Sequence, residues 1–294
     1  MTLPSERKQS LLKRIEQIQS LPALPEVAQR VLALQQQADA ETKTLAEIIE
    51  LDPALASQLL RHASAPFFGR QRKLTSMIDA IAVLGFDRAM NLAVGLSTSQ
   101  AFNVPLDGPV GLRSSWRHAL YSATLMQTLT PHVMEQFRPD MGLAYLSALL
   151  HNIGHLLLAH TFPEEFNNLN QTWEKHPSIS LLATEKNILL AEHPEIGAAL
   201  MRHWLLPAEV LVGIFEHHNP HYRGDHASYP NLLYITNCVL KRQGIGDSDT
   251  DTPPLKLMES LGLAEEDLTE SMDILLKHQP ELDALVVSLR PAVI

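Results

Sequence analysis

A stretch of 21 residues, from position 142 to position 162, contains no Asp, Glu, Lys or Arg. A helix of that length could cross a bilayer or run through the core of a globular protein. The stretch includes His151, Asn152, His155 and His160, and polar side chains of this kind are costly in lipid. We therefore predict one buried helix in the core of a soluble, cytoplasmic protein with no membrane contact.

The remainder of the chain also has the pattern of an all-α protein. Apolar residues recur at helical spacing, and strand-like alternation bounded by turn residues is scarce. Asp52-Pro53 predicts a helix start before residues 54–62, and Thr75 or Ser76 predicts the start of a helix that stops at Gly85. Pro207 predicts a helix over 208–218 with Phe215 on its buried face.

Two turn-rich segments suggest that the chain is divided into three parts. Residues 105–109 contain two prolines and a glycine, and residues 244–254 (GIGDSDTDTPP) form a polar loop. We expect an N-terminal helical bundle over 1–104, a histidine-rich helical domain over 105–245, and a helical tail over 246–294 that packs on that domain.

Charge and cysteine content narrow the function. The chain has 23 Lys and Arg residues against 33 Asp and Glu residues, a net charge of −10, without a block of basic residues. It therefore lacks the basic surface that nucleic-acid binding needs. A local basic patch of Arg61, Arg70, Arg72 and Lys73 is either solvated or a contact surface for another protein. The single cysteine, Cys238, excludes a disulfide scaffold and a cysteine-rich zinc module.

Histidines are concentrated in one part of the chain: 12 of the 14 lie between His118 and His226. Five of them lie on or at the ends of apolar helical segments and could converge on one cavity, as metal ligands do in helical bundles. These five are His118, His151, His193, His217 and His218. A single buried histidine is more often a packed core residue, so convergence and simple packing both remain open for this set.

The remaining histidines give weaker signals. His151 and His155 have the i, i+4 spacing of zinc proteases, but Asn152 stands where those enzymes have a catalytic glutamate. We therefore assign no ligand role to His155 and expect the remaining histidines to be packing or surface residues.

In order, these residues resemble the HD superfamily of metal-dependent phosphohydrolases, which have a His, a His-Asp pair, further histidines and a late Asp. More specifically, the chain resembles the HDOD proteins, the HD-related output domains of bacteria, over about residues 21–237. The matching segments are LPALPEV (21–27), IELDPAL (49–55), LLRHA (59–63), WRH (116–118), ALLHNIG (148–154), HPEIG (193–197), WLLP (204–207) and HH (217–218). The resemblance implies an N-terminal helical bundle packed on an HD-like bundle.

Two positions depart from the HD pattern. Asn152 replaces the aspartate of the His-Asp pair, and Asn237 aligns with the late aspartate. An amide oxygen is a neutral, weaker ligand than a carboxylate, so the two changes remove two formal charges from a site built for divalent cations. The histidines alone could hold one divalent transition-metal ion, and Glu185, Glu192 or Glu195 could supply a missing carboxylate. The Gly-Tyr-Pro motif of the related cyclic-di-GMP phosphodiesterases is also missing; the nearest string is Ser228-Tyr229-Pro230.

We therefore predict no catalytic residues, no cofactor beyond that one possible metal ion, and a non-catalytic signalling module. Such a module is an output or adaptor protein that retains the shell of a hydrolase site. Its expected partners are other signalling proteins, with a small molecule or nucleotide as a ligand for the old pocket. The alternative is a metal-dependent phosphohydrolase or phosphodiesterase with an asparagine-containing metal shell.

Overall fold

The computed structural model describes residues 21–35, 37, 39–64, 74, 76–98, 101–102, 104–105 and 107–288. Every regular element in these ranges is a helix, which confirms the all-α prediction. Arg70, Arg72, Lys73 and Thr75 lie outside the described residues, so the predicted basic patch is described only at the exposed Arg61.

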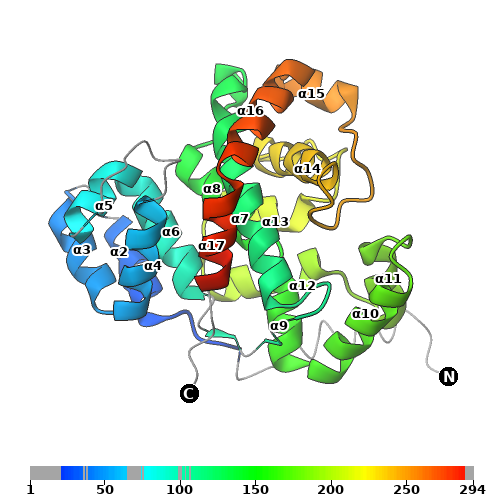
Figure 1. The fold of residues 1–294 in the computed structure, drawn as a ribbon, viewed down its shortest axis with the longest axis horizontal. Helices are drawn as coiled ribbons and strands as arrows, with labels where there is room; N and C mark the ends of the chain where they lie inside the picture. The colour runs from blue at the N-terminus through cyan, green and yellow to red at the C-terminus, as the bar shows by residue number, and fades with distance from the viewer. Residues whose placement is uncertain are drawn as a thin grey trace.

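The first group of helices packs around α6 at one end of the molecule (Figure 1). Its members are α2 (Glu26–Gln35), α3 (Thr42–Glu50), α4 (Pro53–Ala63), α5 (Met77–Leu84) and α6 (Phe86–Thr98). Asp52 caps α4 by accepting hydrogen bonds from the Ala54 and Leu55 amides, and Ser76 caps α5. Gly85 ends α5 with φ of 86°, a conformation that favours glycine. These boundaries confirm the predicted helix starts and stop.

The second group contains the histidine-rich segment and packs on the first through contacts between α6 and α8. It contains α7 (Leu112–Leu129), η3 (Thr130–His132), η4 (Glu135–Phe137), α8 (Met141–Leu150), α9 (Ile153–Thr161), α10 (Pro163–Lys175), α11 (Leu181–Ile188), α12 (His193–His203), α13 (Ala208–Glu216) and α14 (Ser228–Lys241). The core helix α7 packs against α8 and α14. Phe215 is 41% exposed, so its predicted burial was wrong, whereas Val210 and Ile214 face the core.

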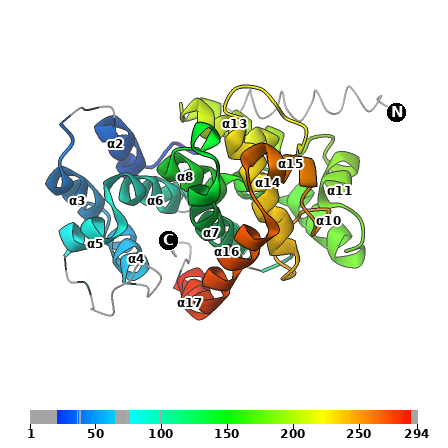
Figure 2. The ribbon, with the colours of Figure 1, turned by 90° about the horizontal axis from the view of Figure 1, so that it is seen from above.

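Three further helices follow: α15 (Leu255–Leu261), α16 (Glu265–Lys277) and α17 (Gln279–Ser288). α16 and α17 both pack on α7, and α17 also contacts α4 of the first group. Seen from above, α17 lies next to α16 at the edge of the molecule (Figure 2).

The uncharged segment forms two helices, so the prediction of a single one was wrong. α8 ends at Leu150, His151 and Asn152 form the turn, and α9 begins at Ile153. The segment Met141–Thr161 is long and apolar enough for a membrane span, yet 89% of its most apolar window is buried inside the protein. That burial fits a core segment, as predicted.

Candidate functional site

The break between α8 and α9 places His151 and Asn152 side by side in the protein interior. His151 is fully buried and Asn152 is 6% exposed. The break also brings the start of α9 against the start of α12. Gly154 permits this approach, because a Cβ atom there would overlap the carbonyl oxygen of His193.

Three imidazoles in this interior have fixed tautomers. His151 Nδ1 lies 2.7 Å from the Ala148 carbonyl oxygen, and His217 Nδ1 lies 2.6 Å from the Ile214 carbonyl oxygen. His193 Nδ1 lies 3.0 Å from the Glu185 carboxylate. Carbonyl and carboxylate oxygens only accept hydrogen bonds, so each Nδ1 atom carries a proton. Each neutral ring therefore keeps a lone pair on Nε2.

These lone pairs face one another. His193 Nε2 lies 3.2 Å from His217 Nε2 and 3.3 Å from His218 Nε2. His151 Nε2 is buried without a hydrogen-bond partner among the described residues. Burial lowers the pKa of His193 to about 4 and the pKa values of His151 and His217 well below their usual range, so all three are neutral at pH 7. Lone pairs at this separation repel unless a cation lies between them.

Asp247 closes the cluster from the loop between α14 and α15. Its Oδ2 atom lies 3.6 Å from His193 Nε2 and 3.5 Å from His218 Nε2, and its Oδ1 atom lies 3.9 Å from His118 Nδ1. Both carboxylate oxygens are buried and lack a hydrogen bond among the described residues. Burial raises the pKa of Asp247, but the surrounding histidines lower it by more, to well below its usual range. The cluster therefore contains a buried carboxylate anion that faces three histidines at 3.5–3.9 Å.

His218 has the opposite protonation preference from its neighbours. Burial lowers its pKa, but the Asp247 carboxylate outweighs burial, and the net pKa lies above the usual value. The Asp247 carboxylate therefore favours the protonated form of His218.

Glu185 holds two histidines of the cluster region, His193 and His155, by hydrogen bonds. Its carboxylate accepts hydrogen bonds from the His193 backbone amide at 2.9 Å and the His193 ring, and its Oε1 atom lies 2.6 Å from His155 Nε2. Burial raises the pKa of Glu185, but His193 and His155 lower it to about 2. Histidines that bind metals commonly donate their second N–H to such a carboxylate, which orients the ring.

His118 is held differently, between two amides. Its Nδ1 atom lies 2.9 Å from Asn152 Nδ2, and its Nε2 atom lies 3.2 Å from Asn237 Oδ1. The Asn152 amide donates to Nδ1, so the neutral ring carries its proton on Nε2, which donates to Asn237 Oδ1, and both ring nitrogens are engaged. Asn152 and Asn237 therefore lie beside the cluster, and they hold His118 by hydrogen bonds.

The donor atoms fit a divalent transition metal. The ligand atoms of His193, His217, His218 and Asp247 all lie within 4.8 Å of one another. Three imidazoles and one carboxylate match the donor set and ligand number of a closed tetrahedral zinc site. Asp247 also belongs to a second group with His118 and His151.

The predicted site residues therefore come together, with several differences from expectation. All five predicted histidines lie in or beside the cluster, and Glu185 reaches it. Glu192 and Glu195 do not, because they form the capping box of α12. His155, for which we predicted no ligand role, contacts Glu185 in the cluster. Asp247 was not predicted as a site residue because it lies in a polar, turn-rich loop. The only sign that this loop packs against the interior was the apolar residue Ile245 between Gly244 and Gly246.

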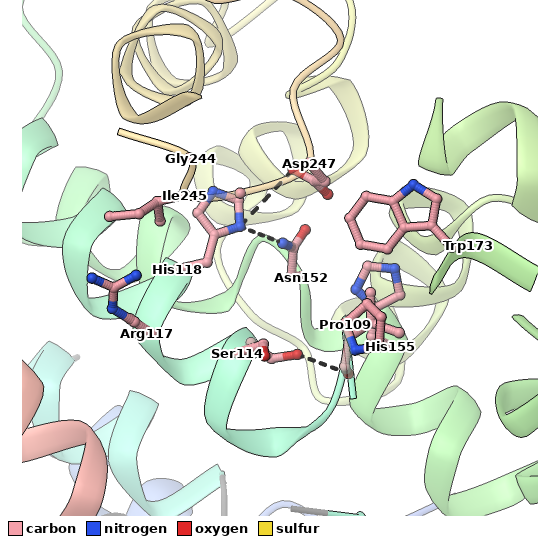
Figure 3. Close-up of a pocket in the computed structure, with 13 residues that line it drawn as sticks. Pro109, Ser114, Arg117, His118, Asn152, His155, Trp173, Gly244, Ile245 and Asp247 are labelled. Carbon is pink, nitrogen blue, oxygen red and sulfur yellow. Dashed lines mark hydrogen bonds and ion pairs between the residues drawn. The ribbon is translucent and has the colours of Figure 1, made fainter. Parts of the chain in front are cut away.

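A pocket of about 290 Å³ opens beside the cluster (Figure 3). Its wall includes His118, Asn152, His155 and Asp247 from the cluster, with Arg117 and Trp173 at its margins. A small molecule bound there would therefore lie against the candidate metal ligands.

Comparison with known proteins identifies relatives of this arrangement. The sequence profile of the HDOD domain matches residues 21–220. A solved structure of a candidate signal transduction protein from Marinobacter aquaeolei VT8 is 33% identical, with a TM-score of 0.84 over 97% of this chain and 65% of that one. A curated protein of Treponema pallidum, described as uncharacterized, is 25% identical over 79% of this chain and 44% of its own length. This chain thus spans about half to two thirds of these two relatives.

Two more distant structures share the fold. An HDOD domain protein of unknown function from Geobacter sulfurreducens has 19% identity and a TM-score of 0.75, over 97% of this chain and 99% of that one. A candidate metal-dependent phosphohydrolase from Shewanella amazonensis SB2B has 22% identity and a TM-score of 0.68, over 96% of this chain and 99% of that one.

Proposed function

Because this chain belongs to the HDOD family, we propose that it is a signal-transduction module whose histidine core binds one divalent transition-metal ion without hydrolysing a phosphate ester. The observation that carries the proposal is the set of inward-facing Nε2 lone pairs around the unsatisfied carboxylate of Asp247. A cation at their centre would remove the repulsion between the lone pairs and balance the carboxylate charge. In this role the chain acts on other signalling proteins.

Ligand number supports a binding role over a catalytic one. His193, His217, His218 and Asp247 supply four protein ligands, and a four-ligand tetrahedral zinc site leaves no position for an attacking water. Catalytic sites of this kind keep one position open. A second ion would need His118, whose ring nitrogens are both engaged by Asn152 and Asn237.

One observation favours a second candidate function, a metal-dependent phosphohydrolase. Asp247 belongs both to the four-ligand set and to the group with His118 and His151, so it could bridge two ions. The pocket beside this second group is large enough for a phosphate ester. In that case the two asparagines would swing away from His118.

Metal stoichiometry and turnover separate the two functions. We would remove bound metal with a chelator, load the protein with Zn²⁺ or Mn²⁺, and measure metal content and hydrolysis of bis(p-nitrophenyl) phosphate. The proposal predicts one equivalent of metal and no hydrolysis above the buffer rate. Two equivalents with turnover would support the phosphohydrolase and contradict the proposal.

The double variant Asn152→Asp, Asn237→Asp is the matched comparison. It places two carboxylates beside His118, so we expect it to bind a second equivalent of metal. If the double variant binds no more metal than the wild type, the two amides are not what prevents His118 from binding a second ion.

A further inference from the structure

The C-terminal helix α17 connects the two groups of helices at the side of α7. Its buried residues Leu282, Leu285 and Val286 face the core, and the helix packs on both α7 and α4 (Figures 1 and 2). A shift of α17 would therefore change the contact between the two groups.

Polar contacts through Asp283 also hold α17 to α7. Asp283 Oδ1 accepts hydrogen bonds from Arg117 Nε at 3.0 Å and from the Tyr121 hydroxyl at 2.8 Å. The Arg117 guanidinium also lies 4.8 Å from the centre of the Tyr121 ring. Arg117 and Asp283 are 37% and 41% exposed, so solvent screens the pair and it can be broken at modest cost.

Arg117 also forms part of the wall of the pocket beside the metal cluster. It precedes His118 on α7, and it lines the pocket together with Ser114 and Trp173 (Figure 3). Asp247 lies on the same wall, where its Oδ2 atom faces His193 Nε2 at 3.6 Å and His218 Nε2 at 3.5 Å. A bound anion would therefore meet the positive charge of Arg117 on this wall. One guanidinium group can bind two phosphate oxygens at once.

We propose that the Asp283 carboxylate pairs with the Arg117 guanidinium where the phosphate group of a small ligand would otherwise bind. A ligand bound in the pocket then draws Arg117 away from Asp283 and loosens α17. The inference rests on the proposed signalling role, since it supplies a route from the pocket beside the core to the surface of the molecule. Phosphate binding and docking of α17 then oppose each other, and each weakens the other by the same factor.

Phosphate titrations of charge variants test this competition. Asp283→Asn removes the competing charge, and Asp273→Asn makes the same change at an exposed position of α16. We expect Asp283→Asn to bind inorganic phosphate up to about fivefold more tightly than the wild type, the upper end of the range for a partly exposed ion pair. Asp273→Asn should match the wild type, and Asp283→Glu should restore wild-type affinity.

Hydrogen exchange provides the second measurement. In the wild type, saturating phosphate should speed amide exchange over residues 279–288, and Arg117→Gln should abolish both phosphate binding and this change. Titration with AMP identifies the source of the phosphate group. Tighter binding of AMP supports a phosphorylated small molecule, and equal binding supports inorganic phosphate; both agree with the competition.

Three results would overturn the inference: no saturable binding of phosphate or AMP, equal affinity in the Asp283→Asn and Asp273→Asn variants, or unchanged exchange of α17 on binding. Metal content measured on the same samples tests the proposed function separately. A protein without metal but with the predicted competition would refute the metal site and leave the inference standing.

Discussion

Asp247→Asn should lower the stability of the protein with and without metal, and it should lower it more with metal. In the metal-free protein, the surrounding histidines hold the pKa of Asp247 well below its usual range, so the ionised carboxylate stabilises the folded state. The amide of the variant carries no charge and cannot pair with His218, whose Nε2 atom lies 3.5 Å from Asp247 Oδ2 in the wild type. Loss of a buried polar partner of this kind costs about 1–3 kcal/mol.

The metal-free variant should therefore melt about 2–6 °C below the metal-free wild type. With metal, the difference widens. At a Zn²⁺ concentration 100 times the Kd, the wild type gains about 2.7 kcal/mol, or about 5–10 °C. If loss of the carboxylate weakens binding about 100-fold, the same concentration stabilises the variant by only about 0.4 kcal/mol.

Thermal unfolding followed by fluorescence, with and without Zn²⁺, measures both effects. The control is Asp251→Asn, an exposed carboxylate of the same loop, which should behave as the wild type in both conditions. If Zn²⁺ stabilises Asp247→Asn as much as it stabilises the wild type, Asp247 is not a metal ligand, and the assignment of the site is refuted.

Three further predictions concern single residues. Glu185→Gln weakens the acceptor that orients His193, so calorimetry should show metal affinity reduced about 10- to 100-fold; unchanged affinity would contradict the supporting role. Gly246→Ala places a Cβ atom 2.5 Å from His118 Nε2 at a residue whose φ is 91°. The control is Gly244→Ala, because Gly244 also has a positive φ but no atom lies within 4 Å of its Cβ position. Gly246→Ala should lower the free energy of unfolding by about 1–3 kcal/mol more than Gly244→Ala. Burial, and then Arg88, lower the pKa of His62 to about 4, so the unfolded chain binds more protons than the folded one between about pH 6.5 and pH 4. The His62 contribution to stability is therefore lost as pH falls through this range, by about 3 kcal/mol, and urea titrations should show a shallower pH dependence in His62→Gln.

The sequence predicts the local elements of this protein well because their signals are local. Asp52-Pro53 and Ser76 mark helix starts through their own side chains, and Gly85 marks a stop through its backbone conformation. Phe215 shows the limit of that reasoning, because apolar spacing on α13 does not say how far the neighbouring helices extend over its face.

The site is less predictable because its contacts are distant in sequence. The histidines could be chosen as candidates from their apolar surroundings. In contrast, Asp247 reaches them from a loop whose composition indicates an exposed turn, and only the packing of that loop on His118 buries the carboxylate. The break at His151 is similar. A run of apolar residues predicts one helix, but the His151 ring bonds back to the Ala148 carbonyl and Asn152 bonds to His118 on α7 at the point where the helix stops.

The location of a bound metal ion tests the account most directly. Anomalous diffraction at the zinc absorption edge, from crystals of the Zn²⁺-loaded protein, would locate the ion without reference to activity. The account predicts one peak bonded to Nε2 of His193, His217 and His218 and to the Asp247 carboxylate, at about 2.0–2.2 Å. No peak at this position, or a peak held only by exposed side chains, would contradict it.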